Sequence, residues 1–223
     1  MATTDHPTRP ARAPRTVALA LAVVVLGCVG LALAFAERPI WSEGGPIEGL
    51  SALLLLVLTI ALAWHARTRL IRFWNLPLLA LALTGRELDL DKRLFDPGLL
   101  KLRMYTGDAP LVDKLLAGAV LALLIWAGIR TLRQGWRPLR AALRGPAGWG
   151  HAVVVGLLLV VVAKSMDGAD RKLRPFGVEF DPRTVLTLGH VEEALELGFA
   201  LCLLLAAWAY PAARRLRGDG RAS

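Results

Sequence analysis

Long apolar segments without charge are the feature that most constrains this chain. Val17–Ala36 is a run of 20 residues that contains no charged side chain. A helix needs about 20 apolar residues to cross the hydrocarbon core of a bilayer. Similar segments recur along the 223-residue chain, of which 55% is hydrophobic. The sequence therefore predicts an all-α, polytopic membrane helix bundle rather than a soluble domain.

Six segments are predicted to cross the membrane, within a bundle at 16–212. The third is interrupted by Asn75 and Pro77, and the sixth carries three glutamates near its start. The predicted spans cover about 17–36, 47–66, 70–89, 111–129, 149–167 and 188–210. Polar tails at 1–15 and 213–223 flank the bundle.

The first apolar segment has two interpretations. Ala34, Phe35 and Ala36 fit the small-x-small pattern of a signal-peptide cleavage site. The uncharged run is, however, longer than the roughly 7–15 residues of a signal-peptide core. We expect a retained first helix, and the orientation of the rest of the chain is the same in either case.

Arginine gathers at alternate ends of the predicted spans. Residues 1–15, 67–72 and 130–144 and the C-terminal tail hold fifteen arginines, no lysine, and only Asp5 and Asp219 as acids. Cytoplasmic segments of membrane proteins are rich in basic residues. We therefore predict that both termini are cytoplasmic, that 130–144 is a cytoplasmic loop, and that the membrane is of the bacterial inner type. If the third segment did not cross the membrane, the arginines of 130–144 would lie on the extracytoplasmic side.

The opposite ends of the spans carry most of the acidic side chains. Glu192, Glu193 and Glu196 fall inside the nominal hydrocarbon region of the last span, with Glu196 about 7–8 Å deep. A charge at that depth is costly unless it faces protein or water, so it indicates a functional site. Because a lone buried carboxylate would protonate, we expect Lys164 or Arg86 to pair with Glu196.

These charges predict a polar site at the extracytoplasmic side of the bundle. The predicted acid–base residues are Glu196, Glu193 and His190. The predicted substrate-binding residues are Glu48, Arg86, Glu87, Lys164, Asp167, Arg171 and Glu192. The spacing of Lys164, Asp167 and Arg171 is i, i+3, i+7, which predicts one helix face. Asp91 and Lys92 are expected to be solvated loop charges.

No metal site is predicted. His65 and His151 lie at the cytoplasmic ends of their spans, most of a bilayer away from His190, so a three-histidine zinc site is excluded by the predicted topology. A site of His190 with two glutamates is left open, and the sequence identifies no cofactor. Cys28 and Cys202 lie in apolar segments and predict no disulfide framework.

Three functions are compatible with this arrangement. The first is binding or processing of a lipid or lipid-linked anionic substrate, whose head group arginine and lysine would hold. The second is a non-catalytic membrane assembly subunit, and the third is a proton- or cation-coupled transporter. Whether the chain is an enzyme is left open. Membrane lipids and other membrane proteins are the expected partners; nucleic acid is not, because membrane orientation accounts for the net charge of +9.

Overall fold

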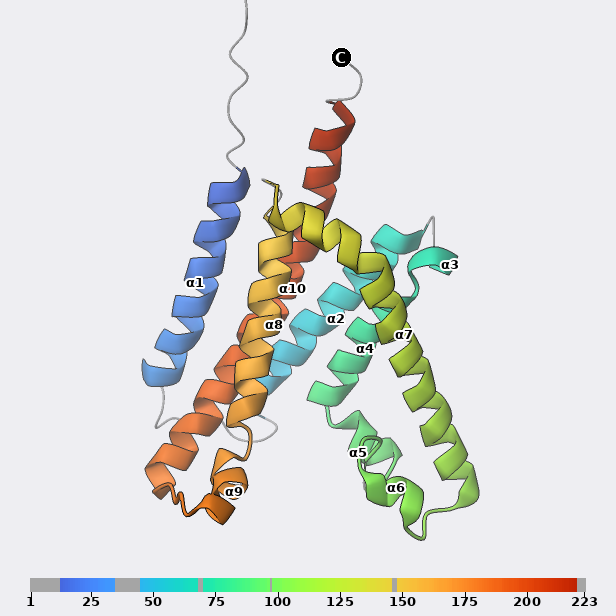
Figure 1. Cartoon of the computed structure of the whole chain (residues 1–223), viewed down its shortest axis with the longest axis vertical. Helices are drawn as coiled ribbons and strands as arrows, with labels where there is room; N and C mark the ends of the chain where they lie inside the picture. The colour runs from blue at the N-terminus through green and yellow to red at the C-terminus, as the bar shows by residue number, and fades with distance from the viewer. Residues whose placement is uncertain (1–12, 35–44, 68–69, 97, 146–147, 220–223) are drawn as a thin grey trace, which may run out of the picture.

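The structure, a computed structural model, describes residues 13–34, 45–67, 70–96, 98–145 and 148–219. Within these ranges the chain is all-helical and contains no strand, as predicted. The longer helices are α1 (Ala13–Ala34), α2 (Pro46–Ala66), α4 (Asn75–Glu87), α7 (Leu111–Leu143), α8 (Trp149–Met166) and α10 (Pro182–Asp219) (Figure 1). The short helices are α3 (Leu70–Phe73), α5 (Leu90–Leu94), α6 (Leu102–Thr106), α9 (Ala169–Leu173) and the 3-10 helix η3 (Arg174–Phe176).

Three of these helices, α2, α7 and α8, are long and apolar enough to cross a bilayer. α1 contributes a shorter apolar segment, Leu19–Cys28, and α4 has only 13 residues. α10 is the longest helix, with 38 residues, and carries charged side chains in its first half. The apolar helices indicate a membrane protein.

The helices give the molecule two chemically different ends. The start of α1, the ends of α2 and α7, and the end of α10 lie toward the top of Figure 1. We call this the arginine end; α2, α3 and α7 bring to it Arg67, Arg72, Arg133, Arg137, Arg140 and Arg144. The acidic end contains Glu48, Glu87, Glu192, Glu193 and Glu196, from α2, α4 and α10. The arginine-rich and acid-rich segments that alternate along the sequence therefore lie at opposite ends of the molecule.

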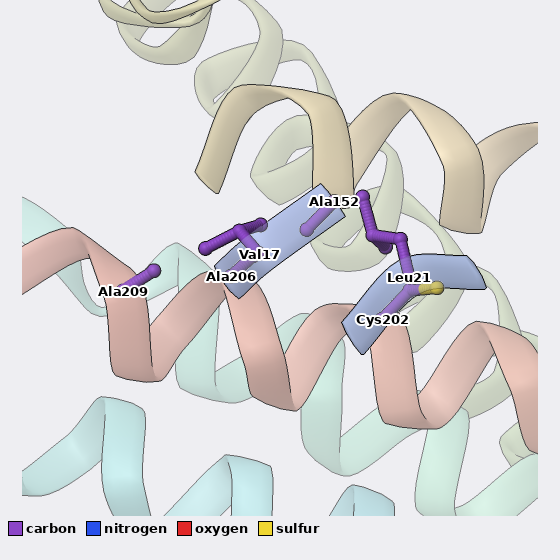
Figure 2. Packing of buried hydrophobic residues seen from close by; sticks show 6 residues of the cluster. All are labelled: Val17, Leu21, Ala152, Cys202, Ala206 and Ala209. Atoms are coloured by element: carbon purple, nitrogen blue, oxygen red, sulfur yellow. The ribbon is translucent and has the colours of Figure 1, made fainter. Parts of the chain in front are cut away.

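α10 is the helix against which α1, α2 and α8 pack. Small side chains form much of this contact. Figure 2 shows one cluster, in which Val17 and Leu21 of α1 meet Ala152 of α8 and Cys202, Ala206 and Ala209 of α10. Small residues let membrane helices approach closely enough for their backbones to gain van der Waals contact. Cys28 and Cys202 are both buried, unpaired cysteines of this packing.

On its other side α10 packs against the pair formed by α2 and α4. Leu55 and Leu58 of α2, Ala80 of α4 and Ala200 of α10 are all buried in one cluster. Because α10 contacts both groups of helices, it holds the end of α8 and the end of α4 at the same level of the bundle.

The prediction of a loop at 130–144 is wrong, because α7 continues as a helix to Leu143. Arginine, leucine, glutamine and alanine are good helix formers, and Ala142 is fully buried against the start of α8. Pro138 lies inside the helix, where it cannot donate the hydrogen bond to the carbonyl of Gln134. The α7 ribbon bends, and its last turns cross over the start of α8 (Figure 1).

The third predicted span is two helices, α3 and α4, with a turn at Trp74. Pro77 has no backbone N–H to donate to the carbonyl of Phe73, so the first turn of α4 cannot continue the hydrogen-bond ladder of α3. Side chains of α7 donate hydrogen bonds to two carbonyls of α3, close to the turn. Arg130 Nη2 donates to the carbonyls of Ile71 at 3.4 Å and Arg72 at 3.3 Å, and Gln134 Nε2 also donates to Arg72 at 3.3 Å.

The last helix begins at Pro182, several residues before the predicted span. Asp181 accepts hydrogen bonds from the backbone N–H groups of Arg183 at 2.9 Å and Thr184 at 3.1 Å, and from the Thr184 hydroxyl. An aspartate that precedes a helix in this way satisfies its first orphan donors. The hydrogen bonds from Thr184 hold the pKa of Asp181 below its ordinary value.

Gly156→Val is expected to destabilise the protein, because the α8–α10 contact has no room for a side chain at this position. A Cβ atom on Gly156 would lie 3.0 Å from Cys202 Cβ. Overpacking of this kind typically costs about 1–3 kcal/mol. Thermal unfolding of the purified protein measures the effect. The matched control is Gly118→Val on α7, where a Cβ atom meets nothing within 4 Å; an equal loss in both variants would contradict the account.

Candidate functional site

A cavity of about 490 Å³ lies at the acidic end, between α2, α4, α5, α8 and α10. Most of its lining is charged, with eight carboxylates and three cations. The lining residues are Ile47, Glu48, Ser51, Arg86, Glu87, Asp89, Asp91, Lys92, Leu100, Lys164, Asp167, Gly189, Glu192, Glu193 and Glu196. Five segments that are distant in the sequence thus contribute charge to one place.

Two cations from different helices pair with Glu196, as the sequence predicts. Lys164 Nζ of α8 lies 2.7 Å from Glu196 Oε1, and Arg86 Nη2 of α4 lies 3.0 Å from the same oxygen. Lys164 Nζ also lies 2.8 Å from Glu192 Oε1 and 3.9 Å from Asp167 Oδ2. We call Arg86, Glu196, Lys164 and Glu192 the ion-pair network. It joins α4, α8 and α10.

The network is only partly buried. The carboxylates are the inner members, with side-chain exposures of 15% for Glu196 and 19% for Glu192. The cations are more exposed, at 41% for Arg86 and 36% for Lys164. Water at the mouth of the cavity can therefore solvate the cations, whereas the carboxylates depend more on their partners.

Glu193 differs from the other glutamates of α10. Its Oε2 atom is buried and makes no hydrogen bond to any residue that the structure describes. A buried carboxylate oxygen ordinarily has a hydrogen-bond partner, so a missing one requires an explanation. Ser51 of α2, whose exposure is 2%, lines the same cavity. Glu193 thus has a carboxylate oxygen, Oε2, that no described residue of the cavity lining binds.

Eight of the ten predicted site residues line the cavity, and His190 and Arg171 do not. Gly189, Glu192, Glu193 and Glu196 follow i, i+3, i+4, i+7 spacing, which is one helix face. His190 is one position after Gly189 and therefore about 100° away from that glycine around the helix.

Arg171 is displaced because the predicted helix face is wrong there. α8 ends at Met166, Asp167 leaves the helical conformation with ψ 114°, and Gly168 is left-handed with φ 58°. Lys172 Nζ then donates to the carbonyls of Lys164, at 3.3 Å, and Asp167, which satisfies the end of α8. Lys164 and Asp167 line the cavity, whereas Arg171 belongs to the next helix.

Asp91 and Lys92, expected to be loop charges, are part of the lining. The cause is a tight turn at Asp89, the one described non-glycine residue with positive φ, at 50°. This turn directs α5 back toward the cavity, and Lys92 Nζ pairs with Asp89 Oδ1 at 2.6 Å. In the sequence, the only indication that Asp91 and Lys92 line the cavity is the run of charged residues that follows Glu87.

Among the residues with described positions, no group of three or more His, Cys, Asp or Glu side chains is arranged to hold a metal ion. The chain matches no protein-family model, no curated protein and no solved structure. The geometry and charge of the cavity are therefore the grounds for a functional assignment.

Lys164→Met is expected to destabilise the protein more than Arg86→Met. Removal of Lys164 leaves two inner carboxylates without their closest cation, which should cost about 1–3 kcal/mol after allowance for partial exposure. Removal of Arg86 leaves Lys164 in place beside Glu196 and should cost less than about 1 kcal/mol. Thermal unfolding of the purified variants measures both. Equal, small losses would mean that Lys164 does not stabilise the glutamates.

Proposed function

We propose that the chain is a multi-pass protein of a bacterial-type inner membrane, with six spans and both termini in the cytoplasm. Three helices have the length and composition of spans. α1, α3 with α4, and α10 would supply the other three. The start of α1 and the end of α10 lie at the same end of the molecule, as an even number of crossings requires (Figure 1). The arginines at that end fit the cytoplasmic side.

Reporter fusions test this topology directly. A fusion after Arg140 should report a cytoplasmic position and a fusion after Gly177 an extracytoplasmic one, because the two residues flank α8. Each fusion should contain all residues from Met1 to the fusion point, and the two should be compared at equal expression. An extracytoplasmic signal at Arg140 would overturn the six-span topology.

At the acidic end, the protein binds a lipid or lipid-linked substrate through its head group. The cavity supports this function, because it is large enough for a head group and lined by partly buried charges of both signs. Ligand sites are typically concave, with a few convergent polar groups. Apolar side chains of α2 and α8 are exposed within about two helical turns of Ser51 or Lys164, which line the cavity; these are Leu50, Leu53, Leu157 and Leu158. Acyl chains would therefore meet an apolar surface.

The charge of the lining favours a head group that has an amine in addition to an anionic group. Arg86 and Lys164 already have Glu196 as a partner. A purely anionic group would face five more carboxylates than cations. An ammonium group could instead bind Glu193 and Glu87, while the phosphate of the same head group accepts hydrogen bonds from Lys164 or Arg86. Processing of this substrate would use Glu193 as the acid–base group.

Native mass spectrometry of the purified full-length protein tests this function. The ratio of amine-bearing phospholipid to phosphatidylglycerol that is retained from an equimolar mixture should be higher for the wild type than for Glu193→Gln. Glu193→Gln should lose at least about tenfold in this preference, because an amide lacks the negative charge that binds an ammonium group. Its thermal stability should be close to that of the wild type.

The matched control is Asp96→Asn, which removes one exposed carboxylate outside the cavity lining. This variant should keep the wild-type preference. If Glu193→Gln and Asp96→Asn retain the amine-bearing lipid equally, the cavity does not select the head group, and the proposal is wrong.

A proton- or cation-coupled transporter is the second candidate, because an excess of carboxylates also attracts a free cation. The buried polar residues among the described positions are Ser51, Asn75 and Thr84. None of them is titratable, so they do not supply a proton relay toward the arginine end. A non-catalytic assembly subunit is the third candidate, in which the ion-pair network only joins helices. In that case Glu196→Gln would destabilise the protein without changing the lipid that it retains.

A further inference from the structure

The helical continuation of α7 creates a surface that a loop would not have. Arg130, Arg133, Arg137, Arg140 and Arg144 are separated by three, four, three and four residues. At about 100° per residue, these positions cover an arc of roughly 80° on one face of a helix. No acid occurs between residues 130 and 144. We call Arg133, Arg137, Arg140 and Arg144, all of which are exposed, the basic face of α7.

Directly beside the basic face lies an apolar one. Leu132, Trp136, Leu139 and Leu143 occupy an arc of roughly 60° that adjoins the arginines. Leu132 is 72% exposed and Trp136 is 62% exposed. The chain thus presents an indole ring and a leucine outward next to a row of guanidinium groups.

The third face of the same segment is fixed to the bundle. Thr131 Oγ1 accepts a hydrogen bond of 2.7 Å from Asn75 Nδ2 of α4; Asn75 is buried and Thr131 is partly buried. Arg130 and Gln134 bind the carbonyls at the end of α3, and Ala142 packs against Gly150 of α8. These anchors leave the segment little freedom to rotate, so the basic and apolar faces both point away from the bundle.

The length of α7 places this segment at a membrane surface. Its 33 residues span about 50 Å, whereas the hydrocarbon core is about 30 Å thick. The uncharged run from Leu115 to Ile129 spans about 22 Å and lies within the core, and Asp113 and Lys114 mark its outer side. The arginine-rich turns then bend across the start of α8 (Figure 1). Trp136 would lie among the lipid head groups, where tryptophan is enriched.

We propose that residues 130–144 of α7 form an interfacial amphipathic helix that binds the phosphate groups of anionic phospholipids in the cytoplasmic leaflet. The basic face supplies the charge, and arginine binds phosphate oxygens through two parallel N–H donors. Leu132 and Trp136 enter the boundary between head groups and acyl chains. Nucleic acid could bind the arginines, but its charged backbone would not cover the apolar face beside them.

The test measures which lipid the full-length protein retains from an equimolar mixture of phosphatidylglycerol and phosphatidylcholine, by native mass spectrometry. The wild type should prefer phosphatidylglycerol. In the triple variant Arg133→Gln, Arg137→Gln, Arg140→Gln this preference should fall roughly tenfold or more. The matched control is Arg93→Gln, Arg103→Gln, Arg183→Gln, which removes the same charge from exposed arginines at the acidic end and should keep the preference.

Two further measurements separate lipid binding from misfolding and from other polyanions. The variant Arg133→Lys, Arg137→Lys, Arg140→Lys keeps the charge and should keep most of the preference for phosphatidylglycerol. In vesicles of brominated phosphatidylcholine with phosphatidylglycerol, the wild type should show bromine quenching of Trp136, measured as the difference from Trp136→Phe.

The proposal is overturned if the glutamine variant keeps its preference for phosphatidylglycerol, or if the control variant loses it to the same extent. It is also overturned if Trp136 is not quenched. Binding of duplex DNA that requires the three arginines, without any lipid preference, would assign the basic face to nucleic acid instead.

Discussion

The close contact between α8 and α10 is the interaction on which the candidate site depends. Gly156 and Ala152 of α8 lie against Cys202 and Ala206 of α10, so the two helices approach more closely than larger side chains would permit. This approach carries Lys164, two turns after Gly156, to the glutamates of α10. The position of the ion-pair network is therefore a consequence of small residues deep in the bundle.

A carboxylate near the apolar part of a membrane must find a cation or water. Glu196 has two cations, from helices that α10 holds on opposite sides. Because both cations reach solvent, the network can rearrange around a ligand without leaving a fully buried charge. Glu193 has no such partner among the described residues, which distinguishes it as the group with unused binding capacity.

The sequence predicts this part of the structure well, because it depends on two strong physical constraints. Uncharged runs of bilayer length predict helices, and the cost of burying Glu196 predicts its pairing with Lys164 and Arg86. The predictions fail where local backbone geometry decides the outcome. The left-handed residues Asp89 and Gly168 change the direction of the chain, which adds Asp91 and Lys92 to the cavity lining and removes Arg171.

The continuation of α7 is missed for a different reason. A run of arginines between two apolar segments is typical of a cytoplasmic loop, and Pro138 strengthens that interpretation. The structure has a helix because its turns are anchored on α3, α4 and α8, and such tertiary contacts cannot be read from one segment. The 3- and 4-residue spacing of the arginines was the available signal. This spacing places the arginines on one face only if the segment is a helix.

The central claim is that the cavity at the acidic end binds the head group of a membrane lipid. A density map of the full-length protein in a lipid nanodisc, prepared with the amine-bearing phospholipid, tests it most directly. The account predicts head-group density between α4, α8 and α10, within hydrogen-bonding distance of Lys164 and Glu193. A map in which the cavity is filled by side chains, with lipid head groups ordered only outside the bundle, would contradict it.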